Sequence, residues 1–195
     1  MKKHIIVVLI TLFTLLFVIS LLMSVTENEG IQNRPVILDG ENRPELKQIE
    51  SAIKNLSIRS IDNDTLMLAD IIEETKFIIY NPEIGCQPCF DTLIDATNKF
   101  SFELENKTIV LSRFYSLRDI KFFKLKNNNT PFAIYDILKT NPECILDAKE
   151  KPMAFMCDST LSISQLFVYD PKNKNYLNAY LSGIETLLKS SPERK

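Results

Sequence analysis

Two cysteines separated by two residues, Cys86 and Cys89, form the pattern in this sequence that is best suited to chemistry. Their segment, CQPC, follows a short loop and opens a stretch with helical spacing. A helix N-terminus carries unpaired N–H groups and about half a positive charge, and both lower the pKa of a thiol. Residues three apart on a helix share a face, so these two sulfurs lie close enough to bridge. The spacing therefore favours a redox pair, with Cys86 where an attacking sulfur can reach it and Cys89 inside the first turn.

Two other uses of this pair remain open. A C-x-x-C segment can supply half of a zinc site, but the remaining thiols, Cys144 and Cys157, have 12 residues between them, and the single histidine, His4, lies in the N-terminal tail. A purely structural disulfide between Cys86 and Cys89 closes a very small loop and gains little from chain entropy. Redox use is favoured over both, since C-x-x-C beside a βαβ pattern is typical of it. We therefore expect no metal and no cofactor.

Cys144 and Cys157 pose a separate question. Cys157 ends an apolar run, and Cys144 follows Asn-Pro-Glu in an expected loop. An exported protein can hold a disulfide between them, and two free thiols are an equal alternative. The sequence does not decide, because connectivity cannot be read from cysteine positions alone.

The composition excludes several classes of function. The 195 residues are 45% hydrophobic and 25% charged, which is ordinary for a globular protein. The chain has 23 Lys and Arg against 25 Asp and Glu, so no basic excess is present to bind a phosphate backbone, and we expect no nucleic-acid partner. With four glycines it contains no glycine-rich phosphate loop, and with one histidine it lacks the Ser-His-Asp and Cys-His constellations.

The elements that would position the cysteines alternate between strands and helices. Hydrophobic periodicity predicts strands over 56–61, 65–68, 76–80, 107–114, 131–135, 153–156 and 164–169, and helices over 86–100, 116–126 and 175–189. Residues 45–55 could form a short helix or an irregular lead-in. The continuous apolar run KFIIY at 76–80 suits a strand buried on both faces. This order predicts an α/β sheet covered by helices on both faces.

From about Ser57 to Lys189 the chain resembles a thioredoxin-fold domain of the membrane-tethered thiol-disulfide oxidoreductases of the TlpA and ResA kind. The resemblance is carried by the hairpin over 58–68 with the following LADII, by the segment KFIIYNPEIGCQPC, and by KPMAF at 151–155. The last segment matches the cis-proline strand that faces the C-x-x-C in the family. The family usually has an aromatic residue before the first cysteine, where this sequence has Gly85. The resemblance implies a thioredoxin-like central mixed β-sheet flanked by helices.

The resemblance also implies an activity, namely thiol-disulfide exchange on protein cysteines through a mixed disulfide. Cys86 would act as the nucleophile and Cys89 as the resolving cysteine. The backbone next to Pro152, together with Lys151, would bind the substrate chain. The alternative is a non-catalytic thioredoxin-like binding module of the cell envelope with a structural disulfide. The sequence leaves the direction of electron flow and the partner open.

An uncharged run of 21 residues, Ile5–Val25, follows Lys2 and Lys3 near the N-terminus. As a helix it would be about 30 Å long, which matches the hydrocarbon core of a bilayer. The two lysines precede it and Glu27 and Glu29 follow it. By the positive-inside rule, the lysines stay in the cytoplasm and the rest of the chain lies outside.

These features predict three parts in the chain. Residues 1–25 would form a single-pass anchor in the cell inner membrane, 26–35 a polar tether, and 36–195 the thioredoxin-like domain. A signal peptide cleaved at Ser24-Val25-Thr26 is the alternative for the first part. Both interpretations place the domain outside the cytoplasm, where its partners would be envelope proteins with cysteines or disulfides.

Overall fold

The computed structural model describes residues 44–82, 85–100, 104, 106–127, 131–138 and 150–190. The chain divides into two compact units, Met1–Arg34 and Pro35–Lys195, and every described residue lies in the second. The predictions for residues 1–25 and 26–35 therefore lie outside the described residues. Within the described ranges, no helix has the length and apolar character needed to cross a membrane.

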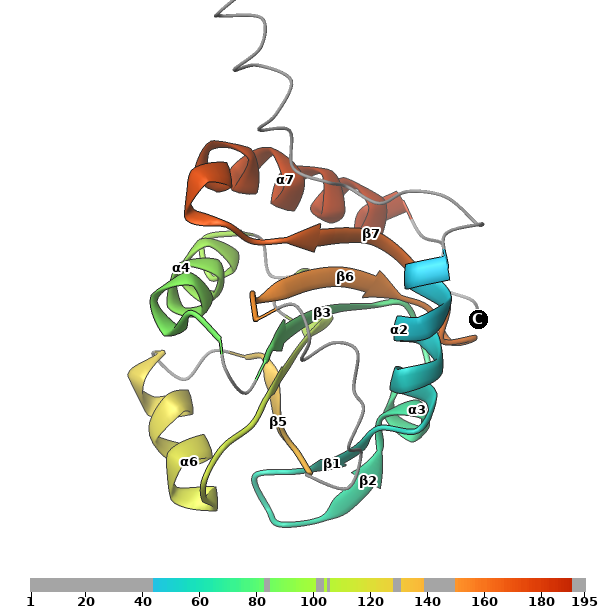
Figure 1. Ribbon diagram of the computed structural model, residues 1–195, viewed down its shortest axis with the longest axis vertical. Coiled ribbons are helices and arrows are strands. Elements are labelled where there is room, and N and C mark those ends of the chain that lie inside the picture. Colours follow the sequence, from blue (N-terminus) through green and yellow to red (C-terminus); the bar gives the residue numbers. More distant parts are fainter. Residues whose placement is uncertain are drawn as a thin grey trace, which may run out of the picture. The chain divides into compact units, whose positions relative to one another are not determined.

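Strands of the described chain build one seven-stranded mixed sheet in the order β2-β1-β5-β4-β3-β6-β7 (Figure 1). Strands β3, β4 and β5 run parallel, and the other neighbouring pairs are antiparallel. The strands are β1 Ser57–Arg59, β2 Thr65–Met67, β3 Lys76–Asn81, β4 Thr108–Ser112, β5 Ala133–Ile137, β6 Met153–Cys157 and β7 Ile163–Val168.

Strand β3, which leads to the cysteine pair, lies in the interior of the sheet. Every residue from Phe77 to Asn81 is buried, as expected for a continuous apolar strand that is covered on both faces. Tyr80 pairs with Leu111 of β4 on one side and with Met153 of β6 on the other. This register brings the C-terminal ends of β3 and β4 and the N-terminal end of β6 to the same edge of the sheet.

Helices cover both faces of the sheet. The helices α4 (Gln87–Thr97), α6 (Leu117–Lys126) and α7 (Lys174–Ser190) pack on one face, and α2 (Pro44–Lys54) and the short α3 (Leu68–Ile71) pack on the other (Figure 1). The crossovers β3-α4-β4 and β4-α6-β5 step across the sheet in the same direction. Because such crossovers are right-handed, α4 and α6 lie on the same face.

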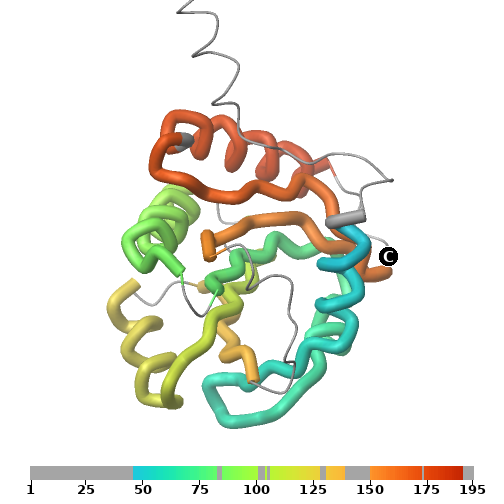
Figure 2. Tube along the Cα trace, viewed as in Figure 1, coloured from blue at the N-terminus to red at the C-terminus, as the bar shows by residue number. Residues whose placement is uncertain are grey.

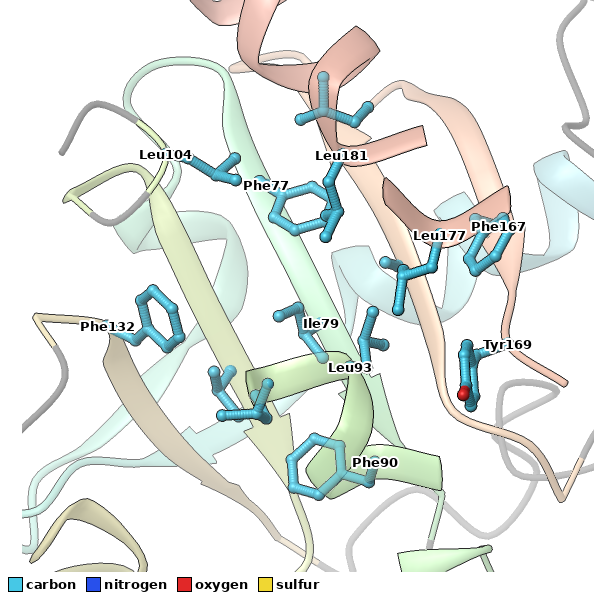
Figure 3. Packing of buried hydrophobic residues seen from close by; sticks show 14 of the residues in the cluster. Phe77, Ile79, Phe90, Leu93, Leu104, Phe132, Phe167, Tyr169, Leu177 and Leu181 are labelled. Carbon is cyan, nitrogen blue, oxygen red and sulfur yellow. The ribbon is translucent and has the colours of Figure 1, made fainter. Parts of the chain in front are cut away.

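The core consists of two clusters separated by the sheet. Side chains of a strand alternate between faces, so Phe77 and Ile79 enter one cluster, whereas Ile78 and Tyr80 enter the other. Figure 3 shows Phe77 and Ile79 among Leu93 of α4 and side chains of α7. The cysteine-bearing helix is therefore anchored directly on the strand that precedes it.

Residues 44–54 form a helix, which decides between the two interpretations of this segment. Figure 2 shows this helix beside the later strand β7. The Glu50 carboxylate accepts hydrogen bonds from the Ile163 N–H at 2.9 Å and from the Ser162 hydroxyl at 3.3 Å. The predicted alternation of strands and helices is confirmed, and α3 and a 3₁₀ turn at Pro171–Asn173 add to it.

Candidate redox site

The two cysteines of the C-x-x-C form a disulfide at the N-terminus of α4, with their Cα atoms 5.1 Å apart. Cys86 is the N-cap residue, and its carbonyl accepts hydrogen bonds from the N–H groups of Cys89 at 2.9 Å and Phe90 at 3.0 Å. Its sulfur accepts a further hydrogen bond from the Cys89 N–H at 3.3 Å. Pro88 lies in the first turn, where a missing N–H leaves no helical bond unmade. The predicted proximity of the two sulfurs is confirmed.

The two sulfurs differ in exposure. Cys86 is half-buried, whereas Cys89 is 4% exposed and belongs to the core between α4 and the sheet. A partner's sulfur can therefore approach Cys86 more easily than Cys89. This asymmetry suits the predicted roles of an attacking and a resolving cysteine, which stay predictions.

Gly85, the residue before the pair, lies against the end of β3. A Cβ atom at this position would lie 3.0 Å from Asn81 Oδ1 and 3.0 Å from the Pro82 carbonyl oxygen. Contacts this short require a neighbour to shift, and the Pro82 oxygen belongs to the backbone. The aromatic residue usual in the family does not fit at Gly85 without rearrangement of this turn.

Lys151 and Pro152 come directly before β6. Because Met153 of β6 pairs with Tyr80 of β3, they lie at the same edge of the sheet as the start of the loop to Cys86. The structure corrects one expectation here, because every described peptide bond is trans and no cis-proline is present at Pro152. Trans is the favoured form of an X–Pro bond, and the Pro152 carbonyl extends the β6–β7 ladder by accepting from Tyr169 N–H at 2.9 Å. The substrate-binding role of both residues stays a prediction.

The Lys151 ammonium group is held by an ion pair. Its Nζ lies 2.6 Å from the Asp170 carboxylate, and both side chains are partly exposed. The hydrogen bond from Lys151 and one from the Lys172 N–H lower the pKa of Asp170. A substrate that used the Lys151 charge would compete with Asp170 for it.

Cys157 ends β6 as a buried free thiol, whereas Cys144 lies outside the described residues. Burial raises the pKa of the Cys157 thiol to about 12, and the nearby Asp158 and Glu50 charges act in the same direction. The structure therefore has Cys157 as a free thiol rather than as one half of a disulfide. In the part of the chain that the structure covers, no cluster of three or more His, Cys, Asp or Glu is arranged to hold a metal ion.

A cavity of about 490 Å³ opens beside the disulfide. Gly85 and Gln87, the residues on either side of Cys86, form part of its wall. Its polar floor is made by residues at the ends of the three parallel strands, namely Asn81 of β3, Ser112 of β4 and Asp136 of β5. These floor residues were not predicted from the sequence. Their one signal is their position at the carboxyl ends of parallel strands, where ligands of open α/β sheets bind.

Hydrogen bonds fix the polar groups of this floor. Asn81 Nδ2 donates to the Ser112 hydroxyl at 3.1 Å. The Asp136 carboxylate is 2% exposed and accepts from Arg59 Nη2 at 2.5 Å and from Phe114 N–H at 2.8 Å. The Arg59–Asp136 ion pair thereby ties the N-terminal hairpin to the edge of the sheet that carries the site.

The architecture is shared with solved structures of redox proteins, although the sequence matches no protein-family model and no curated protein. A cysteine-to-serine mutant of Xanthomonas campestris peroxiredoxin Q matches with a TM-score of 0.51 and 13% identity, covering 71% of this chain and 94% of that chain. The chain has a thioredoxin-like fold.

Two further structures are similar. The bacterioferritin comigratory protein of Xanthomonas campestris, which is described with an alkyl peroxide reduction activity, matches with a TM-score of 0.50 and 13% identity over 80% of this chain and 99% of that chain. A thiol:disulfide interchange protein from Bacteroides sp. matches with a TM-score of 0.47 and 12% identity over 71% of this chain and 88% of that chain. At these identities the likeness concerns the fold, and the chemistry has to be argued from the residues of this chain.

Proposed function

We propose that this protein exchanges disulfides with cysteine-containing proteins of the cell envelope. The observation that carries the proposal is the Cys86–Cys89 disulfide at the N-terminus of α4, with one sulfur half-buried and the other 4% exposed. A structural disulfide needs no reachable sulfur, whereas exchange requires one. The thioredoxin-like fold supplies the scaffold, and the activity is inferred from the site.

When the pair is reduced, exchange proceeds in two steps. The Cys86 thiolate attacks one sulfur of a substrate disulfide, a new S–S bond forms, and the second substrate sulfur leaves as a thiolate that takes up a proton. The Cys89 thiol then loses its proton and attacks Cys86 Sγ. The Cys86–Cys89 disulfide forms, the first substrate sulfur leaves as a thiolate, and two electrons have passed to the substrate. The reverse sequence oxidises a substrate dithiol.

The start of α4 favours the charged form of Cys86 in the first step, in which Cys86 attacks, and in the reverse sequence, in which Cys86 leaves the mixed disulfide. The N–H of Cys89 points at Cys86 Sγ, and the positive end of the helix dipole lies at the same place. Both effects stabilise a thiolate, so Cys86 becomes a better leaving group and is more often ionised at neutral pH.

Substrate binding beside Pro152 is part of the proposal. The Pro152 carbonyl is already engaged by Tyr169, and proline has no N–H. A substrate chain would therefore pair with the backbone of Lys151, next to the trans Lys151–Pro152 bond.

We place the domain outside the cytoplasm, anchored in the inner membrane by residues 1–25. The support for this placement is the uncharged run Ile5–Val25 with Lys2 and Lys3 before it. Protease added to spheroplasts should cleave the domain while sparing cytoplasmic proteins. A soluble species that lacks residues up to Ser24–Thr26 would favour a cleaved signal peptide instead.

The experiment that tests the function is capture of the mixed disulfide. In Cys89→Ser the resolving thiol is missing, so substrates should remain attached to Cys86 and be released by reductant. Cys157→Ala should leave this capture unchanged when it is combined with Cys89→Ser, because the Cys157 thiol is buried away from the site. If Cys89→Ser captures nothing, and association with partners survives in Cys86→Ser/Cys89→Ser, the protein is a binding module rather than a catalyst.

A further inference from the structure

The cavity beside the disulfide lies on the opposite side of β3 from Pro152. Its walls come from β1, β3, β4, β5, α4 and α6, and among the described residues none from β6 lines it. In the sheet, β4 and β6 are the two neighbours of β3. A ligand in this cavity would therefore reach Cys86 from the β4 side, whereas a chain paired beside Pro152 would reach it from the β6 side.

Among the residues that the structure describes, the cavity residues include a buried acceptor and a buried donor for which no hydrogen-bond partner is found. Asn81 is 7% exposed, and its Oδ1 accepts no hydrogen bond, although its Nδ2 donates to Ser112. The Nε of Arg59 is likewise buried and without an acceptor. Asn81 Oδ1 lies beside Gly85, where an added Cβ atom would be 3.0 Å from the oxygen. Buried polar atoms are normally paired, so this acceptor and this donor point to a ligand that supplies one of each.

The charges of the cavity favour an uncharged ligand. Arg59 and Arg113 contribute two positive charges, and Asp119 and Asp136 contribute two negative ones. The Asp136 charge is matched by Arg59, and Asp119 accepts a hydrogen bond from the Ser116 hydroxyl at 2.8 Å. A phosphate or a carboxylate would find no excess of positive charge here. A peptide group is neutral and carries one N–H and one C=O.

The rim of the cavity provides an apolar contact for side chains. Phe114 and Phe123 lie with their rings 5.7 Å apart, and Tyr115 beside them is 100% exposed. A fully exposed tyrosine next to a cavity is typical of the residues that anchor polypeptide partners, because it offers a large apolar area with little side-chain entropy to lose.

We infer that this cavity binds the polypeptide segment adjacent to the substrate's reacting cysteine. The segment's N–H donates to Asn81 Oδ1, its C=O accepts from Arg59 Nε, and a side chain packs on Tyr115. The inference rests on the proposed function and adds to it a second docking site for the substrate. It implies a preference for polypeptide disulfides over small disulfides that cannot fill the cavity.

The test compares two substrates on the full-length protein, with dithiothreitol as the reductant. Insulin serves as the polypeptide disulfide, and bis(2-hydroxyethyl) disulfide serves as the small one. Tyr115→Ala and Asn81→Leu should each raise KM for insulin about five-fold, and both should leave the rate with the small disulfide within about two-fold. Tyr176→Ala is the matched control, since this tyrosine is 38% exposed on α7 and lies outside the cavity.

The other outcomes distinguish this inference from the proposed function. If the variants lose activity equally on both substrates, or if neither variant changes KM for insulin, the cavity assignment is wrong. The proposed disulfide exchange stands in both cases. An equal rise in KM for glutathione disulfide would show a small-molecule site and also overturn it. If the wild-type protein reduces neither substrate and its disulfide oxidises no polypeptide dithiol, the proposed function fails. In that case the cavity is tested by insulin binding to the variant Cys86→Ser/Cys89→Ser, with and without the further change Tyr115→Ala. A loss of binding on Tyr115→Ala supports the docking site, whereas unchanged or absent binding overturns it.

Discussion

The sulfur of Cys86 accepts a hydrogen bond from the backbone N–H of Cys89, with the two atoms 3.3 Å apart. This contact exists because Cys86 is the N-cap of α4 and Cys89 is the third residue of the helix. The same geometry that lets the sulfurs bridge thus also places a donor on the sulfur that a partner can reach. Ser, Asp and Asn cap helices through an oxygen in the same way, and here a sulfur takes that place.

We expect the Cys86 thiol of the reduced protein to be more acidic than a free thiol, whose pKa is near 8.5. Alkylation by iodoacetamide, followed against pH by mass spectrometry, should modify Cys86 first and with a midpoint below that value. Cys89 should react more slowly, because it is 4% exposed. Cys86→Ser and Cys89→Ser are the controls, since each leaves one thiol of the pair. Equal rates for both cysteines with a midpoint at or above 8.5 would contradict the prediction.

Gly85→Ala should destabilise the protein by roughly 1–3 kcal/mol, because the new methyl group would lie 3.0 Å from Asn81 Oδ1 and from the Pro82 carbonyl oxygen. Urea denaturation gives the free energy of unfolding. The matched control is Gly183→Ala in α7, where no atom lies within 4 Å of the added Cβ. That change should stabilise the protein by about 0.5–1 kcal/mol, since alanine favours a helix interior. Equal stability of Gly85→Ala and the wild type would show that the turn yields easily.

The fold was predictable where one segment determines its own structure. The apolar run at β3 and the spacing of Phe90, Leu93 and Ile94 in α4 both indicate their elements without reference to the rest of the chain. The order of strands in the sheet was not predictable in this way, because pairing depends on residues distant in sequence. The end of β5 shows the limit: Asp136 is a buried residue of this strand, whereas the strand was predicted to end at 135. Its charge is accommodated by Arg59, 77 residues away.

The Arg59–Asp136 pair should contribute measurably to stability. Asp136→Asn keeps an acceptor for the Phe114 N–H but leaves the Arg59 charge unmatched in a partly buried place. We expect a loss of about 2 kcal/mol, less than for a fully buried pair because the Arg59 side chain is 26% exposed. Arg59→Met combined with Asp136→Asn should lose less than the sum of the single changes by about 1 kcal/mol. Strict additivity in this double-mutant cycle would contradict a direct interaction.

The candidate site was predicted in part. Cys86 and Cys89 stand in one short motif, so their proximity follows from helix geometry alone. The expected cis-proline was wrong at Pro152, because a resemblance in position does not determine the isomer that the local ladder favours. The cavity floor escaped prediction because Asn81, Ser112 and Asp136 come from three separate strands and meet only through the sheet order.

The buried Cys157 thiol makes stability depend on alkaline pH. Its pKa is raised from 9.0 to about 12 in the folded protein, chiefly by burial. Below pH 9 the thiol is neutral in both states, so its full contribution is present. Above pH 9 the unfolded chain loses this proton while the folded protein retains it, so the free energy of unfolding falls between pH 9 and 12. The slope from this group approaches about 1.4 kcal/mol per pH unit.

Urea denaturation of the oxidised protein between pH 8 and 10.5 measures this dependence, and Cys157→Ala is the control because it removes the titrating thiol. Burial also raises the pKa of Tyr135 and Tyr180, so both proteins lose stability at high pH, and only the difference between them reports Cys157. The wild type should lose more stability than Cys157→Ala over this range. In the native protein at pH 8, iodoacetamide should leave Cys157 unmodified and should label it after unfolding. Parallel stability curves for the two proteins, or rapid native labelling of Cys157, would mean that this thiol is reached by solvent and that the end of β6 opens in solution.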